Sequence, residues 1–343
     1  MRPISAADAI SPAIERTRTL LFRPFSWGTY LKLGLVAILT EGVGSNLRSS
    51  THHGPSPSGG PPILHFPPQW VAAIVALMVA GFLLAMVIFY LITRLRFAFF
   101  HCLIHNTKEL RPGWHIYRDP ATRFFWLNLV VGFCFLLGIA VIAIPFAAGF
   151  WRLFHNIPPG GHPDIAAMIA LVLPLIPIVL LLVLAGFMAD VVLRDWMLPH
   201  FALENATSGE AWSSVWASIK AEKRQFFVYA LLRLILPTIA LIVLFFVFLI
   251  PGLILVGSLA AVEYSIHGAF AHAAGASALI GLVLEIFFGV LAFGFGLLLG
   301  ICIGGPVSTG LREFALVFYG GRYPVLGNIL WSPVASPVPP LSA

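Results

Sequence analysis

Long apolar segments separated by short polar ones run along most of the chain. A bilayer core about 30 Å thick requires roughly 20 apolar residues in a helix. Six segments are long enough, at about 27–45, 70–94, 124–150, 167–193, 226–256 and 276–306. A barrel would instead show alternating segments of about ten residues. The pattern therefore predicts an all-α integral membrane protein with six transmembrane helices, of which the first, carrying Lys32, Thr40 and Glu41, is the weakest.

A different periodicity precedes the first predicted span. Residues 11–22 begin with Ser11-Pro12, typical of an N-cap followed by the first helical residue. Apolar residues then recur at helical spacing, which predicts an amphipathic helix lying on the inner membrane surface. At the other end, residues 332–343 are rich in proline and predict a disordered cytoplasmic tail. Residues 1–331 are thus expected to form a single six-span domain.

Composition and charge support the membrane class and give an orientation. The chain is 59% apolar and 10% charged, which excludes a soluble globular, disordered or collagenous protein. With the N-terminus in the cytoplasm, sixteen of the 20 Lys and Arg residues fall on the inner side and only Arg48 and Arg152 in outer loops. This asymmetry predicts that both termini are cytoplasmic. The net charge of +6 suits anionic lipid, so we expect membrane lipids and no nucleic acid as partners.

Similar junctions recur along the chain. Odd-numbered spans start with an arginine followed by aromatic residues, at Arg23, Arg123 and Arg224, spaced by 100 and 101 residues. The even-numbered spans end in RFAFFHCLIHN, RDWMLPHFALEN and REFALVFYGG, which begin with Arg96, Arg194 and Arg312. Arginine and aromatic side chains anchor helix ends at the headgroup layer. The pattern predicts three tandem units, each a surface helix plus a transmembrane hairpin, with these six arginines as interfacial anchors.

These junctions also carry a resemblance. The stretch RPFSWGTYLKLG, followed by hydrophobic hairpins with aromatic-basic junctions, resembles uncharacterised bacterial polytopic membrane families. They include relatives of the membrane domain found beside some glycerophosphodiester phosphodiesterases. The resemblance spans roughly residues 10–325 and rests on pattern, without a catalytic motif. It implies a polytopic fold at the bacterial inner (cytoplasmic) membrane, and it transfers no activity and no functional residue.

Glu285 is the main candidate residue, because it lies within the sixth predicted span. An ionised carboxylate at the bilayer centre costs about 2.5–3.5 kcal/mol or more. Glycines mark a stripe for close helix packing on this helix, at Gly281, Gly289, Gly296, Gly300 and Gly304. We therefore expect Glu285 to point into the bundle. Two roles stay open: a proton- or cation-handling carboxylate, or a structural group that is protonated or paired with Arg233.

Other polar residues carry weaker signals. Asp190 and Arg194 are spaced i, i+4 and predict a local interfacial ion pair. Glu41, near the outer end of the first span, is expected to be solvated. His101 and His105 have a spacing that can hold a metal, but further ligands are lacking. Because nucleophile, phosphate-loop and metal motifs are absent, no catalytic, cofactor-binding or metal site is expected.

The sequence therefore favours a non-enzymatic membrane protein. It would scaffold, assemble or regulate a membrane complex by helix packing, with a membrane protein or a second copy as partner. The alternative is a small-solute transporter or channel that uses Glu285 and Arg233. A lipid-active enzyme is least favoured, because it needs polar groups clustered at headgroup depth, near His101, His105 and His200.

Overall fold

The structure, a computed structural model, describes residues 4–41, 68–155, 165–270 and 276–331. These residues form helices and contain no strand. The helices are, in order, α1 (Ile10–Phe22), α2 (Trp27–Glu41), α4 (Pro68–His105), α5 (Arg111–Ile116), α6 (Arg118–His155), α7 (Ile165–Val172), α8 (Leu175–Val191), the π-helix η1 (Val192–Met197), α9 (Leu198–Leu203), α10 (Ser208–Ala221), α11 (Lys223–Phe270), α12 (Ala276–Gly320) and α13 (Pro324–Leu330).

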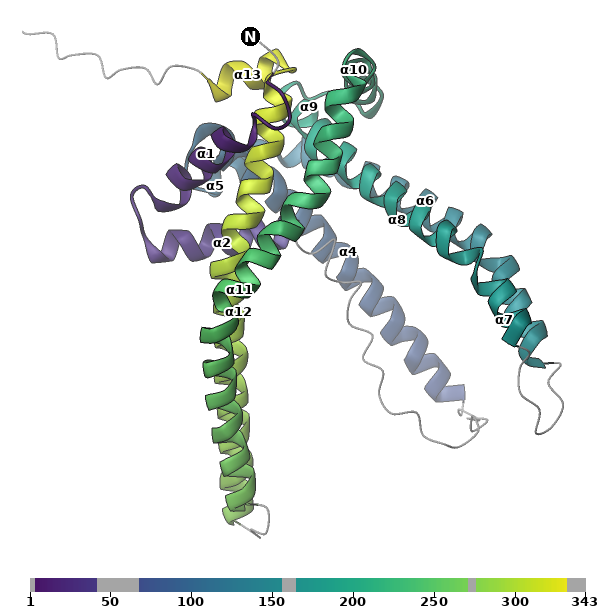
Figure 1. Cartoon of the computed structure of the whole chain (residues 1–343), viewed down its shortest axis with the longest axis vertical. Coiled ribbons are helices and arrows are strands. Elements are labelled where there is room, and N and C mark those ends of the chain that lie inside the picture. Colours follow the sequence, from purple (N-terminus) through teal and green to yellow (C-terminus); the bar gives the residue numbers. More distant parts are fainter. Residues whose placement is uncertain (1–3, 42–67, 156–164, 271–275, 332–343) are drawn as a thin grey trace, which may run out of the picture.

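The helices form one head from which three legs diverge (Figure 1). We define the head as residues 4–41, 93–127, 190–233 and 301–331, which contain nearly all the buried side chains. The first leg is the remainder of α4. The second is α6 packed against α7 and α8, and the third is α11 packed against α12. Both the N-terminal α1 and the C-terminal α13 lie in the head.

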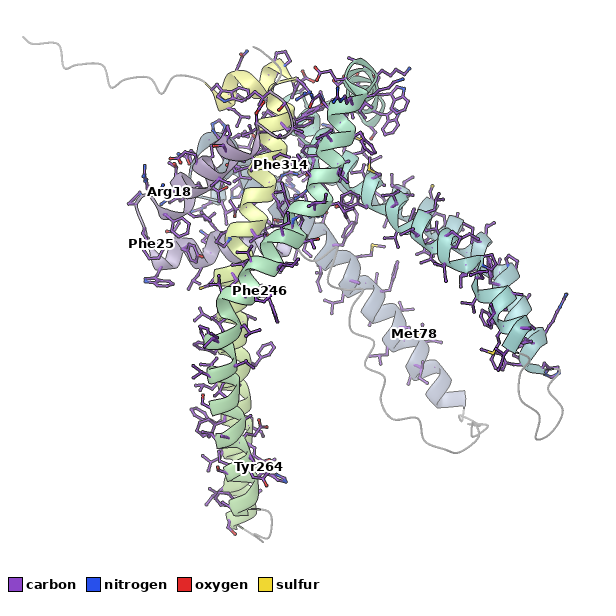
Figure 2. The ribbon with its side chains drawn as sticks, viewed as in Figure 1. Arg18, Phe25, Met78, Phe246, Tyr264 and Phe314 are labelled. Atoms are coloured by element: carbon purple, nitrogen blue, oxygen red, sulfur yellow. The ribbon has the colours of Figure 1, made fainter. Side chains whose placement is uncertain are left out.

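The legs expose apolar side chains along their length. In Figure 2, Met78 projects outward from α4, and Phe246 and Tyr264 project outward from α11. Within the described residues, six helical stretches are long and apolar enough to cross a membrane: Ala72–His105, Arg118–His155, Ile165–Leu203, Lys223–Val247, Leu249–Phe270 and Leu279–Gly320. Side chains of this kind require a hydrocarbon solvent or a partner. The chain therefore has the architecture of a multi-pass helical membrane protein.

The first predicted span, 27–45, is not among these stretches, and α11 supplies two of the six. The described part of this segment, α2, has 15 residues and a length of about 22 Å, which is less than a bilayer core of about 30 Å. Residues 42–45 of the predicted span lie outside the described residues. Helix α2 lies in the head, where it packs against α12, α4 and α1. The polar residues that weakened this segment explain its position, because Thr40 and Glu41 are buried among charged groups of the head.

Aromatic side chains fill the core of the head. Phe97, Phe124 and Phe201 stack edge to face where α4, α6 and α9 meet. Tyr229 of α11 stacks against Phe314 and Phe318 of α12. Such ring pairs contribute about 0.5–1.5 kcal/mol beyond their buried area. The head is thus packed like the interior of a soluble domain, whereas the legs are not.

Local sequence signals set several helix ends in the head. A capping box starts α10: the backbone N–H of Thr207 donates to the Glu210 carboxylate, and the backbone N–H of Glu210 donates to the Thr207 hydroxyl. The predicted amphipathic helix at 11–22 is the observed α1. Asn106 and Asn205, which follow α4 and α9, both have positive φ angles, of 51° and 55°. Asparagine tolerates this left-handed conformation, which ends a helix.

Candidate functional site

Three of the predicted anchor arginines meet in the middle of the head. Arg96 comes from α4, Arg194 from η1 and Arg312 from α12, and all three are buried. From the sequence, these guanidinium groups were predicted to lie at the lipid headgroups. They instead contact protein: the Nη2 atoms of Arg96, at 3.1 Å, and of Arg194 both donate to the backbone oxygen of Thr40. The last carbonyls of a helix attract cations, and Thr40 lies at the C-terminal end of α2.

Glu41, the next residue, is the central carboxylate. Its Oε2 lies 3.0 Å from Nη2 of Arg233 and 3.5 Å from Nη2 of Arg194, while Oε1 lies 4.0 Å from Nε of Arg312. The expectation of a solvated Glu41 is therefore wrong: its side chain is 4% exposed. Burial alone raises the pKa of this carboxyl, but attraction by the surrounding arginines outweighs burial and lowers the pKa to about 2. Glu41 is therefore ionised at neutral pH.

Asp195 is the second buried carboxylate. Its Oδ2 accepts hydrogen bonds from the Tyr229 hydroxyl at 2.8 Å and from Nε of Arg233 at 3.1 Å. Its Oδ1 accepts from Nη1 of Arg312 at 3.0 Å. Asp195 lies in the π-helix η1, an irregularity that often occurs at functional sites. The carboxylate is thus enclosed by three donors from the third leg's helices.

We call Glu41, Arg96, Arg194, Asp195, Arg233 and Arg312 the arginine cluster. The predicted ion pair of Asp190 with Arg194 is present at 2.8 Å, at the half-exposed edge of the cluster. Four guanidinium groups thus face two buried carboxylates and one at the edge. The members come from α2, α4, η1, α11 and α12, so the cluster contacts all three legs where they enter the head. Breaking such a buried pair leaves an uncompensated charge and costs about 3–5 kcal/mol.

The remaining predicted anchors lie away from this cluster. Arg23 and Arg224 are exposed, and Arg123 bonds to the backbone and side chain of Asn205. Whether they meet a headgroup stays a prediction.

Glu285 lies in the third leg, with its Oε1 3.0 Å from Nδ1 of His267 across the α11–α12 hairpin. Its side chain is 33% exposed and lies in a leg of two helices, so it does not point into a helix bundle. Arg233 instead bonds Asp195 and Glu41. The pairing of Glu285 with Arg233, which the sequence left open, is therefore not formed.

The predicted packing glycines differ among themselves. Positions 289, 296 and 300 have open space where a Cβ would stand. A Cβ at Gly281 would meet Phe270 of α11, and one at Gly304 would meet Ile38 of α2. At Gly305, outside the predicted set, the contact is with backbone, because a Cβ would lie 2.7 Å from Cα of Gly34. The predicted small residues therefore serve helix packing only at the two ends of the stripe, against α11 at Gly281 and against α2 at Gly304.

The histidines weighed for chemistry form two separate polar groups. His200 is buried, with Nε2 2.7 Å from the Tyr319 hydroxyl and Nδ1 3.2 Å from Glu204. His101 contacts His105 through its ring and the Tyr117 hydroxyl at 3.4 Å. Among the described residues, no group of three or more His, Cys, Asp or Glu is placed to hold a metal ion.

Glu41 and Asp195 were missed as site residues. The available signal was their setting, because a carboxylate within a long apolar segment is rare and generally has a partner. Asp195 directly follows Arg194 in RDWML, as Glu313 follows Arg312 in REFAL. Glu313 is also buried and bonds Arg16 of α1 at 2.8 Å.

The long apolar helices and the charged head define a multi-pass helical membrane protein. Residues 4–329 match the family of unknown function DUF7544, and the chain belongs to this family. The match carries no link to the membrane domain found beside glycerophosphodiester phosphodiesterases. Neither a curated protein nor a solved structure matches the chain.

Proposed function

We propose that this protein is a non-enzymatic scaffold that organises other components of the membrane by helix packing. The observation that carries the proposal is the arginine cluster, which fixes three apolar legs to one head. Each leg exposes large apolar side chains, among them Leu84, Phe133 and Phe293. Because the legs diverge from the head, their surfaces are accessible to a membrane protein or to a second copy of this chain (Figure 1).

We also propose that the head faces the cytoplasm at the bacterial inner membrane, with both termini there. All described Lys and Arg residues except Arg152 lie in the head. This distribution follows the positive-inside rule. It also places α1 and α10 at the cytoplasmic surface.

We further propose that the head is built on the three-unit repeat. In this proposal the units are residues 10–105, 111–205 and 208–320, each of which begins with a short helix and ends with a helix that returns from a leg to the head. Arg96, Arg194 and Arg312 then occupy equivalent positions at the returning ends. Short helices α5, α10 and α1 pack on the returning helices of the first, second and third units, respectively. The π-helix accommodates one extra residue in the second unit, so that Asn205 corresponds to Asn106.

Small-solute transport is the alternative, and the His267–Glu285 pair in the third leg favours it. An ionisable pair within an apolar leg suits proton or cation handling. Arg233 has no part in this version, because it is bonded in the arginine cluster.

Photo-crosslinking tests the scaffold proposal in cells. A photoreactive amino acid is placed at Leu84, Phe133 or Phe293 on the legs, with Glu15 on the surface of α1 as the matched control. The proposal expects discrete protein adducts from at least one leg and none of the same size from Glu15. Legs that yield only lipid adducts would overturn it. Ion flux through proteoliposomes that Glu285→Gln abolishes would establish transport instead.

A further inference from the structure

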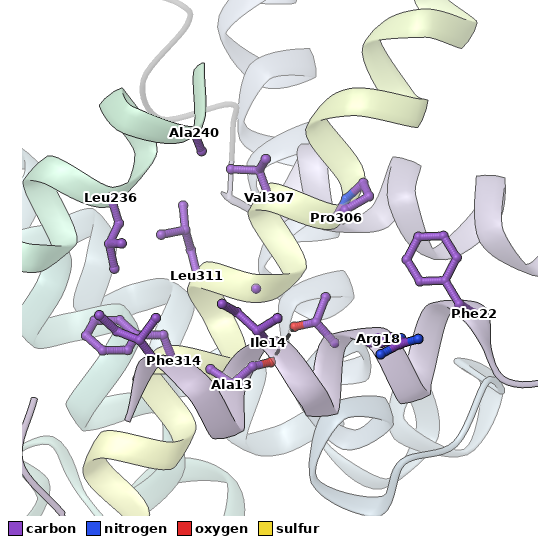
Figure 3. Close-up of a pocket in the computed structure, with 13 residues that line it drawn as sticks. Ala13, Ile14, Arg18, Phe22, Leu236, Ala240, Pro306, Val307, Leu311 and Phe314 are labelled. Atoms are coloured by element: carbon purple, nitrogen blue, oxygen red, sulfur yellow. Dashed lines mark hydrogen bonds between the residues drawn. The ribbon is translucent and has the colours of Figure 1, made fainter. Parts of the chain in front are cut away.

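A cavity of about 740 Å³ lies between α1, α11 and α12, where the third leg enters the head (Figure 3). Ile14 and Phe22 line it from α1, Leu236 and Ala240 from α11, and Val307 and Leu311 from α12. The volume is in the range of ligand sites, about 300–1,000 Å³. Its wall is almost entirely hydrocarbon, so the ligand must be largely apolar.

Helix α1 presents a separate face to this cavity. Ile10, Ile14, Arg18 and Phe22 are spaced by four residues and therefore lie along one side of the helix. Ile14 is 61% exposed and Phe22 is 44% exposed, although other α1 residues are buried in the head. Exposed apolar side chains that line a hollow indicate that something apolar covers them.

Arg18 is the single charged residue of the lining. Its guanidinium makes no hydrogen bond or ion pair with the part of the chain that the structure describes. Arg16, two positions earlier, instead bonds Glu313 at 2.8 Å, and the Thr17 hydroxyl donates to the backbone oxygen of Ala13 (Figure 3). Arg18 is therefore available to bind an anion, and its guanidinium group matches the geometry of a phosphate or a carboxylate.

The cavity borders membrane-facing surface. Leu236 and Ala240 belong to the stretch Lys223–Val247, and Val307 to Leu279–Gly320. Ile235 and Ile239, beside them on α11, are exposed. An acyl chain could thus enter from the bilayer without crossing polar protein.

We propose that an anionic phospholipid occupies this cavity, with an acyl chain between α1, α11 and α12 and its phosphate on Arg18. Apolar lining, one unpaired cation and contact with the leg surface together match this ligand. The bound lipid would tie the surface helix α1 to the third leg. This inference is independent of whether the protein is a scaffold or a transporter.

Native mass spectrometry of the full chain tests the proposal. The protein is reconstituted in vesicles of equal phosphatidylcholine and phosphatidylglycerol, extracted in mild detergent, and its retained lipids are counted. Arg18→Gln removes the cation, and Ala240→Trp fills the cavity. Arg23→Gln is the matched control, because Arg23 is an exposed cation just beyond α1 that does not line the cavity. Ile14→Glu, at an exposed position, adds a negative charge beside the phosphate.

The wild-type protein and Arg23→Gln should retain phosphatidylglycerol in preference to phosphatidylcholine. Arg18→Gln should lower phosphatidylglycerol retention about fivefold, since one cation near the membrane contributes about 1 kcal/mol. Ile14→Glu should lower it as well, and Ala240→Trp should lower retention of both lipids. Three results would overturn the proposal. Phosphatidylglycerol retention could be unchanged in Arg18→Gln and Ile14→Glu, it could fall equally in Arg23→Gln, or the wild-type protein could retain a bound polypeptide in place of the lipid. Inorganic phosphate should not displace the lipid, because it lacks the acyl chain.

Discussion

Helix α12 passes from the third leg into the head, and its two ends have opposite surroundings. In the leg, Leu279 and Phe293 are 65% and 74% exposed, whereas in the head every residue from Phe314 to Tyr319 is buried. In the leg, the partner of Glu285 among the described residues is His267 on the adjacent helix. Arg312 in the head contacts Arg194, Asp195 and Glu41, all from other helices. The head is held by cross-helix polar contacts, while the legs depend on their solvent.

This difference means that equal chemical changes should have unequal effects in the two regions. In the head, removing one charge leaves others buried without compensation. In a leg, the same change leaves groups that a partner or the bilayer surface can still accommodate.

Asp195→Asn should produce the largest loss of stability. It removes the carboxylate shared by Arg233, Arg312 and Tyr229, at an expected cost of about 3–5 kcal/mol. The measurement is unfolding by SDS in mixed micelles, followed by fluorescence. Asp190→Asn is the matched control, because Asp190 is half-exposed and its loss should cost about 1 kcal/mol or less. Equal losses in the two variants would contradict a special role for the buried cluster.

Glu41→Gln should show a loss that depends on pH. The pKa of Glu41 is lowered from 4.5 to about 2 in the folded protein, so above pH 4.5 its charge makes its full contribution to the stability of the folded state. This contribution, about 3 kcal/mol, disappears as pH falls through about 2. Unfolding curves of wild type and variant should therefore differ at pH 5–8 and converge towards pH 2. Glu15→Gln, on the surface of α1, should follow the wild type throughout. A difference that stays constant down to pH 2 would contradict the assigned charge.

Gly305→Ala should cost about 1–3 kcal/mol, because its Cβ would lie 2.7 Å from the Cα of Gly34 and force α2 and α12 apart. Gly300→Ala changes the same helix where a Cβ meets open space, and it should be neutral or slightly stabilising. The SDS midpoints of the two variants give the comparison. Similar midpoints would mean that α2 can move away from α12 without a loss of stability.

Much of the leg architecture could be predicted from the sequence, because apolar length alone selects helices that can span a bilayer. The head could not be predicted as well. Glu41 appears near the end of an apolar segment, which suggests an outer surface, and only the three-dimensional convergence of Arg96, Arg194 and Arg312 shows that it is enclosed. Their recurrence in the sequence was visible, but an arginine at a helix end is equally suited to lipid headgroups and to a buried carboxylate. The i, i+4 spacing predicted the ion pair of Asp190 with Arg194. Contacts between residues far apart in the sequence have no such spacing to reveal them.

Glu285→Gln should have the smallest effect on the stability of the head. It therefore tests most directly whether the head unfolds independently of the legs. The substitution removes a charge whose described partner, His267, is 74% exposed. We expect the SDS-induced unfolding of the head to change by less than about 0.5 kcal/mol, as for other substitutions away from buried features. His267→Gln is the companion variant and should behave alike. A loss as large as that of Asp195→Asn would show that the third leg and the arginine cluster unfold together. A small loss of stability with a complete loss of ion flux would instead assign Glu285 to transport.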